Sequence, residues 1–239
     1  MSSFASRGLY GGAITVNLPA DFIDSSTLRQ IPDHQEVYLS PGTLTSIVLE
    51  INQYVTPSLT ASHSDADAAA AAAAAASIAA TASVPEATTA AAAGTGAVVS
   101  LNDNAAALYH LHDLVDPSDT LTIISTPKAI QMHRPSLQGL PALLLRAKLT
   151  SREEAARTPS APPETYHHTP DVVQTSTSIR LLLTRLAGKA TDLCVSVNVP
   201  WKELEGRDGA VEAEEAFAER VVEELVGSLD VRDWGLFGD

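Results

Sequence analysis

Acidic residues near the N-terminus are the strongest candidates for chemistry in this sequence. Asp24, Asp33 and Glu36 lie close together, and Glu50 follows them. Two carboxylates can in principle serve a hydrolase that cleaves glycosidic bonds. Pockets for organic substrates are rich in aromatic side chains, however, and only 5% of this chain is aromatic. Acids at turns are most often solvated surface, so taken alone these residues are either ordinary surface or an acidic binding edge.

Other candidate nucleophiles and metal ligands lack partners in the sequence. His110 and His112 stand two residues apart on an expected helix, so they point to different sides, and no third ligand follows at the spacing of a zinc site. His167 and His168 have no cysteine or carboxylate at ligand spacing, and Cys194 has no nearby histidine base. Phosphate-loop and hydrolase motifs are also absent from the sequence. We therefore expect no catalytic residue, metal or cofactor.

Charge and composition restrict the classes of partner. The chain of 239 residues carries a formal net charge of −14, which disfavours nucleic acid and anionic membranes and suits a basic protein partner. Solubility alone is the alternative explanation of this charge. A single cysteine excludes an internal disulfide and fits a reducing compartment. The sequence has no secretory signal and no long run of large apolar residues, so we expect a soluble intracellular protein.

A strand–turn–strand unit is predicted to position the first acids. Alternating apolar and polar residues predict a strand over 9–18, and Pro19 ends it because proline lacks a backbone donor. Asp24 or Ser25 can cap a short helical turn that ends near Arg29. The acids before the next strand are therefore expected at turns.

Two further strands are predicted to carry Glu36 and Glu50 on outward faces. Glu36 alternates with apolar residues in a strand over 36–39, which places it on the exposed side. Glu50 alternates with three large apolar residues in a strand over 44–54, so it is expected to point away from the core.

The remainder of the chain predicts an α+β fold. Helices are expected over 102–115, capped by Asn102 or Asp103, and from Ala210 to Gly227, where glutamates fill the face opposite an apolar stripe. Further strands are predicted over 121–125, 140–149, 179–186 and 193–199. Short connections favour a mainly antiparallel sheet of about six strands, covered by helices.

One domain over 8–239 is expected, with two interruptions. Residues 56–100 form an alanine-rich, low-complexity insertion that lacks a large apolar face for docking. Residues 150–175 are rich in proline and threonine and are predicted to be a flexible loop.

Several segments resemble one known family. LYGGAITVNLP (9–19) and FIDSSTLRQIPDHQEVY (22–38) resemble the N-terminal signature of the Ran guanine nucleotide release factor family, the Mog-type nuclear import proteins. Shorter matches follow in the family's order: SIVLEI (46–51), YHLHDL (109–114), TDLCVSVNVP (191–200) and LDVRDWGLF (229–237). The resemblance implies a three-layer α/β/α sandwich related to the photosystem subunit PsbP, and a monomer found in the nucleus and cytoplasm.

The same resemblance implies a function and a set of binding residues. It implies that the chain binds the small GTPase Ran and promotes guanine nucleotide release in nuclear import, by protein binding and not by covalent chemistry. The expected partner-binding positions are Asp24, Arg29, Asp33, Glu36, Glu50 and Gln53. Gln53 departs from the family's pattern, because an acid is expected there. The alternatives are a Ran-binding or scaffold module without exchange activity, and a PsbP-like ligand-binding protein.

Overall fold

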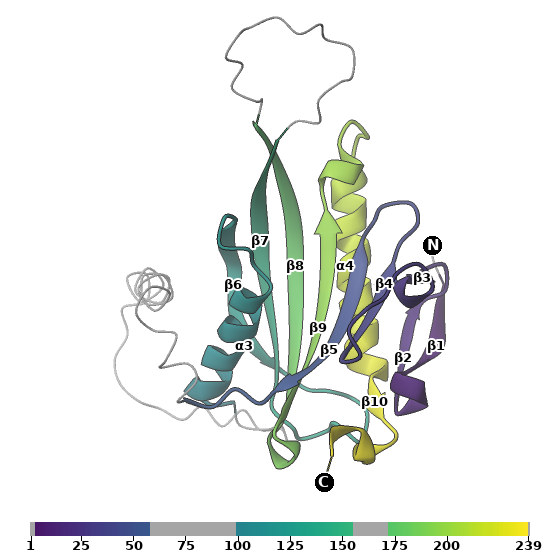
Figure 1. The fold of residues 1–239 in the computed structure, drawn as a ribbon, viewed down its shortest axis with the longest axis vertical. Coiled ribbons are helices and arrows are strands. Elements are labelled where there is room, and N and C mark those ends of the chain that lie inside the picture. Colours follow the sequence, from purple (N-terminus) through teal and green to yellow (C-terminus); the bar gives the residue numbers. More distant parts are fainter. Residues whose placement is uncertain (1–2, 58–98, 155–171, 239) are drawn as a thin grey trace, which may run out of the picture.

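One long antiparallel sheet forms the middle of the molecule (Figure 1). The computed structural model describes residues 3–57, 99–154 and 172–238. Within these ranges seven strands form the sheet, and all neighbouring pairs are antiparallel. In spatial order they are β3 (Ile23–Asp24), β4 (Gln35–Leu39), β5 (Ser46–Gln53), β9 (Thr191–Pro200), β8 (Val172–Leu186), β7 (Ala142–Glu154) and β6 (Thr120–Ile130). The six predicted strands of this sheet are confirmed, and β3 is too short for an alternation pattern to reveal it.

The single strand predicted over 9–18 is wrong, because the chain reverses inside it. Strand β1 (Phe4–Leu9) pairs with β2 (Ile14–Pro19), and β10 (Asp230–Val231) completes a small three-stranded sheet within the described residues. The reversal is the turn η1 (Tyr10–Gly12), in which all three residues have positive φ angles of 50°, 68° and 93°. Glycine adopts this left-handed backbone without steric cost, so two of the three turn positions are unstrained.

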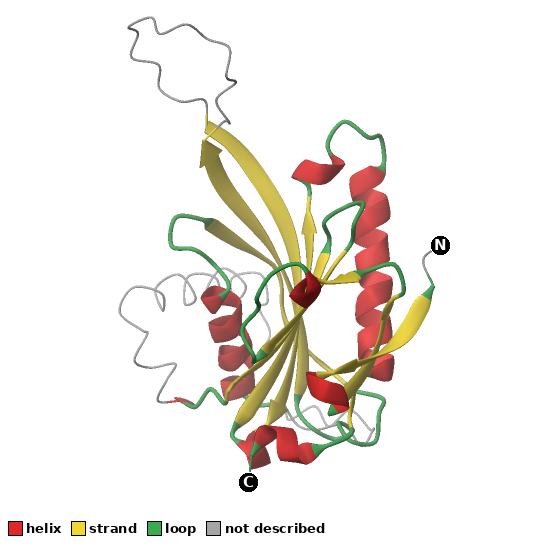
Figure 2. Cartoon of the chain, turned by 45° about the vertical axis from the view of Figure 1, so that its right-hand side comes forward, coloured by secondary structure: helices red, strands yellow, loops and turns green. Residues whose placement is uncertain are grey.

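Two helices of the described residues lie on opposite faces of the large sheet, α3 (Leu101–Asp113) on one and α4 (Ala210–Ser228) on the other (Figure 2). Alternate residues of β8 show this: Leu181 and Leu183 pack in the apolar cluster of α3, whereas Leu182 packs in that of α4. The small sheet lies on the α4 side, where β2 contacts the helix. The predicted three-layer α/β/α sandwich is therefore confirmed.

The helix ends differ from the prediction by a few residues. Ser100 caps α3, not Asn102 or Asp103, and Asp103 completes a capping box by accepting the Ser100 backbone N–H. Gly227 does not end α4, which continues to Ser228. No described helix is long and apolar enough to cross a membrane.

The predicted loop over 150–175 is too long at both ends. Strands β7 and β8 continue their pairing from Thr150 opposite Ser176 to Glu154 opposite Val172. Alternation is weak there because threonine, serine and arginine replace large apolar residues. The central part, 155–171, lies outside the described residues, as does 58–98 of the alanine-rich insertion.

The periodicity of α4 predicts that its glutamates lie on the face opposite the apolar stripe, but two of them face the sheet. Glu215 and Glu219 bind the guanidinium of Arg180 at 2.5 and 2.7 Å, and Arg180 is only 4% exposed. The physical reason is that β8 directs this arginine towards α4, so the helix needs acids on its inner flank. Ala213 is three residues from Ala210, at the spacing of the expected apolar stripe, but it is exposed.

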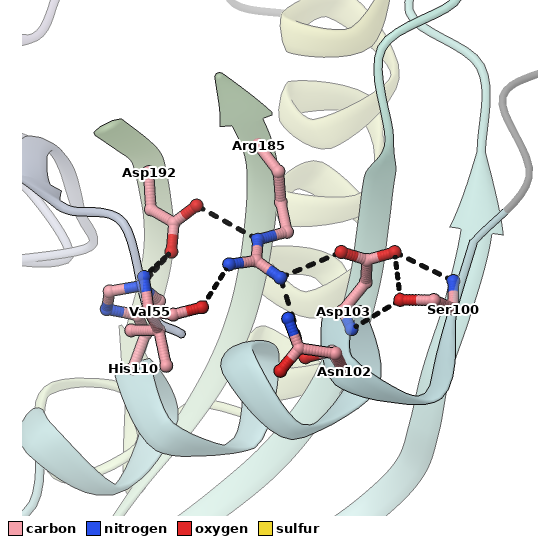
Figure 3. Close-up of polar contacts among 7 residues, drawn as sticks. All are labelled: Val55, Ser100, Asn102, Asp103, His110, Arg185 and Asp192. Carbon is pink, nitrogen blue, oxygen red and sulfur yellow. Dashed lines mark hydrogen bonds and ion pairs between the residues drawn. The ribbon is translucent and has the colours of Figure 1, made fainter. Parts of the chain in front are cut away.

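A buried ion network joins β8, β9, α3 and the end of β5 (Figure 3). Arg185 and Asp192 are both 0% exposed, and Arg185 Nε donates to Asp192 at 3.0 Å. Arg185 also donates to Asp103 at 2.7 Å and to the carbonyl of Val55 at 2.5 Å. His110 Nε2 lies 2.9 Å from Asp192, which explains this histidine as a buried structural residue.

Removing Arg185 should be far more costly than removing an exposed arginine. We expect Arg185→Met to lower the free energy of unfolding by about 3–5 kcal/mol, because two buried carboxylates lose their cation. Arg146 pairs with Glu219 at the surface, so Arg146→Met should cost at most about 1 kcal/mol. Urea unfolding of both variants measures the difference, and equal losses would contradict the assigned importance of the network.

Asp103 should make stability sensitive to acid. Burial alone would raise the pKa of Asp103, but hydrogen bonds from Ser100 and Arg185 outweigh it and hold the pKa below its ordinary value. Because the pKa of Asp103 is lower in the folded state, its carboxylate contributes its full stabilisation above the unfolded-state pKa of about 3.9. That contribution is lost as the pH falls through the folded-state pKa. We expect Asp103→Asn to cost about 2 kcal/mol at pH 7 and clearly less at pH 2–3, measured by urea unfolding at each pH. A pH-independent cost would refute the carboxylate's role.

Candidate partner-binding site

Glu50 lies in the interior of the sheet, on the side of the sheet that carries α3. It stands on β5 directly opposite Gln35 of β4 and opposite Cys194 of β9. Its Oε1 accepts a hydrogen bond from Gln35 Nε2 at 2.5 Å, and the side chain is half-buried. Because β5 is held between β4 and β9, this carboxylate has a rigid backbone under it.

Glu36 points to the other face of the sheet. It stands opposite Leu49, whose side chain is buried in the α4-side core, so Glu36 and Glu50 project in opposite directions. Glu36 is half-buried, and its Oε1 accepts the backbone N–H of Tyr10 at 2.7 Å. The expectation that Glu36 lies on an exposed face is wrong, because the turn between β1 and β2 covers that face.

Asp24, Arg29 and Asp33 lie along the connection from β3 to β4. Asp24 caps the short turn η2 (Ser25–Thr27), accepting the Ser26 N–H at 2.8 Å, which confirms the predicted cap. Asp33 and Arg29 are exposed. Arg29 makes no side-chain hydrogen bond or ion pair with the rest of the described chain, so no contact supports an orienting role within this protein.

Two tyrosines, Tyr10 and Tyr38, lie near the acids of β4 and β5. The hydroxyl of Tyr10 lies within hydrogen-bond distance of two carbonyls, those of His34 (3.1 Å) and Leu49 (3.0 Å). Burial, and then the negative charges of Glu36 and Glu50, raise the pKa of Tyr10. Burial, Glu36 and Asp24 raise the pKa of Tyr38 to about 12. Both phenols therefore stay protonated at neutral pH, and Tyr10 remains a hydrogen-bond donor.

The six predicted positions thus fall into separate groups. Glu50 and Gln53 lie on β5, and Asp33 lies just before β4, whose first residue pairs with Glu50. Gln53 is exposed. Glu36 and Asp24 project from the α4-side face, opposite to Glu50, and both are bonded to backbone N–H groups. Alternation along β5 places Gln53 on the α4 side as well, at the end of the strand.

Two contributors were missed by the sequence reasoning. Gln35 holds Glu50 across the strand pair, and Tyr10 bridges the N-terminal turn to β4 and β5. The Gly11–Gly12 pair was an available signal for the turn, because glycine pairs commonly mark chain reversals.

The other candidate groups are engaged elsewhere. Cys194 is buried, and burial raises the pKa of its thiol, so it stays a neutral core residue. Among the described residues, no three histidine, cysteine or acidic side chains gather in a way that could hold a metal ion. What the site offers is acidic and amide side chains on a rigid strand pair, an arrangement suited to binding a basic surface.

Known proteins resemble this chain in sequence and in structure. A "Probable ran guanine nucleotide release factor" of Dictyostelium discoideum is 42% identical over 52 residues, which cover 22% of this chain and 27% of that protein. "Nuclear import protein MOG1" of Saccharomyces cerevisiae is 66% identical over 32 residues, covering 13% and 15%. The "Ran guanine nucleotide release factor" of Homo sapiens is 46% identical over 43 residues, covering 18% and 23%. The matches span 27% or less of these relatives.

Solved structures share the fold across the full length. The crystal structure of the Saccharomyces cerevisiae Ran-binding protein Mog1p superposes with a TM-score of 0.55 and 22% identity, covering 100% of both chains. A structure of a mutant of protein Mog1 superposes with a TM-score of 0.51 and 22% sequence identity, covering 99% of this chain and 100% of that one. A family model described as "Ran-interacting Mog1 protein" matches residues 7–200. Since this match covers most of the chain, the protein belongs to the Ran-interacting Mog1 family.

Proposed function

We propose that this chain binds the small GTPase Ran and promotes release of its guanine nucleotide, in support of nuclear protein import. Family membership over residues 7–200 is the observation that carries the proposal. The relatives' names, release factor and nuclear import protein, point the same way. We place the protein in the nucleus and cytoplasm, acting as a monomer.

The proposed contact surface is the end of the β4–β5 pair, formed by Asp33, Glu50 and Gln53. Asp33 and Gln53 are exposed, and Glu50 is half-buried beside Gln35. Arg29 lies on the connection that leads to Asp33, whereas Asp24 lies near the other end of β4, opposite Tyr38. A chain with a net charge of −14 attracts a basic partner over long range, and the acids near the contact set its orientation.

Release follows from a difference in affinity. A small GTPase holds its nucleotide through Mg²⁺, a lysine and backbone donors around the phosphates. Carboxylates on a rigid surface stabilise the empty form by pairing with basic groups that the phosphates leave behind. A partner that binds the empty form more tightly than the loaded form must weaken nucleotide binding by the same factor. This mechanism needs no covalent step.

Release of a fluorescent guanine nucleotide from purified Ran tests the function directly. We expect this protein to accelerate release and to form a complex with Ran that survives gel filtration. A complex without acceleration would favour the alternative of a binding module without exchange activity. Glutamine in place of an acid at position 53 would then explain the missing activity. Neither complex nor acceleration would sink the proposal.

Removing the acids of the contact surface should weaken the interaction without unfolding the protein. We expect Asp33→Ala and Glu50→Ala each to raise the Kd for Ran about 3- to 10-fold, because a charge at the contact is lost. Glu223→Ala removes an exposed acid on the outer side of α4 and serves as the control, with Kd unchanged. Titration calorimetry measures Kd, and thermal unfolding checks the fold. Equal Kd values for all four proteins would exclude this surface.

Restoring an acid at Gln53 should strengthen the interaction. We expect Gln53→Glu to lower the Kd about 2- to 5-fold, mainly through faster association, and the gain should shrink at high salt. The side chain is exposed, so the substitution has no desolvation cost in the free protein. Stopped-flow association at low and high salt measures the effect. A slower association rate for Gln53→Glu would contradict the placement of Gln53 beside basic groups of Ran.

A further inference from the structure

The turn between β1 and β2 has an unusual backbone and one strong anchor. Tyr10, Gly11 and Gly12 all have positive φ, and at Tyr10 this conformation is strained because a side chain is present. The backbone N–H of Tyr10 donates to Glu36 Oε1 at 2.7 Å. A hydrogen bond to a carboxylate is stronger than one between neutral groups, so Glu36 is suited to hold a strained turn in place.

The side chain of Tyr10 continues this connection into the contact surface. Its hydroxyl can donate its one proton to the carbonyl of His34 or to that of Leu49. His34 directly follows Asp33, and Leu49 directly precedes Glu50. The tyrosine therefore touches the backbone next to both acids of the proposed surface.

Glu36 itself projects away from Glu50. It stands opposite Leu49 of the α4-side core, whereas Glu50 projects from the opposite face of the same sheet. Its carboxylate is half-buried and bonded to the turn. One carboxylate cannot hold this N–H and also meet a partner on the other side of the sheet.

We infer that Glu36 is a positioning residue: it holds the Tyr10–Gly12 turn, and through Tyr10 it sets the backbone that carries Asp33 and Glu50. This inference rests on the proposed function for its effect on Ran. It differs from a direct contact because the acceptor oxygen of Glu36 is the essential feature, and the charge only strengthens the hydrogen bond. Substitution by glutamine separates the two, since glutamine keeps an acceptor oxygen and loses the charge.

The test compares Glu36→Ala, Glu36→Gln and Tyr10→Phe in the nucleotide-release assay. We expect Glu36→Ala to slow nucleotide release from Ran about 10-fold, and Glu36→Gln to recover to within about 3-fold of the original protein. Tyr10→Phe keeps Glu36 but loses the hydroxyl, and it should slow release as Glu36→Ala does. Equal losses for Glu36→Ala and Glu36→Gln, with Tyr10→Phe at the original rate, would overturn the inference in favour of a charge contact.

A second measurement does not involve Ran. Hydrogen exchange followed by NMR should show the Tyr10 amide exchanging at least about 10-fold faster in Glu36→Ala, and much less so in Glu36→Gln. If the original protein fails to stimulate nucleotide release, the proposed function fails. Hydrogen exchange at the Tyr10 amide still tests the hydrogen bond to Glu36 in that case. Unchanged Tyr10 exchange in Glu36→Ala would overturn the inference whatever Ran does. Faster hydrogen exchange at Tyr10 in Glu36→Ala, combined with undiminished nucleotide release from Ran, would also overturn the inference.

Discussion

The buried guanidinium of Arg185 is the interaction on which the arrangement of the other elements depends. It binds Asp192 on the neighbouring strand, Asp103 on α3 and the carbonyl of Val55 after β5 (Figure 3). A charge removed from water must be fully compensated, so each partner has to be in place for the others to be stable. Val55 precedes the 58–98 segment and Asp103 follows it, so both flanks of that segment are bonded to one side chain.

The proposed contact surface is built on the same strands as this network. Asp192 stands opposite Asn52 in the β9–β5 pair, two residues from Glu50, and Glu50 itself stands opposite the buried Cys194. The acid is therefore carried by a strand whose neighbours are tied into the core. A rigid support favours the proposed role, because an acid that is already fixed loses less conformational entropy when a partner binds.

On the other side of the sheet, long polar side chains are absorbed by the elements that cover it. Arg180 of β8 meets Glu215 and Glu219 of α4, and Glu36 of β4 meets the backbone of Tyr10. In each case a polar strand residue is bonded to the layer above it, as buried polar groups require. Arg180 and Glu36 are thus engaged within the α4 side, while Asp33 and Gln53 remain exposed at the end of the β4–β5 pair.

Local patterns determined much of this protein from sequence alone: six strands of the large sheet, the amphipathic helix from Ala210, a capped turn at Asp24 or Ser25 and the membership suggested by the opening motif. Alternation separates the two faces of a strand, but it does not say which face another segment covers. Only the tertiary structure decided that Glu36 lies under a turn and Glu50 on the opposite face, because the cover comes from residues distant in the chain. The same holds for His110, whose partner Asp192 is 82 residues away and is brought to it only by the packing of α3 on the large sheet.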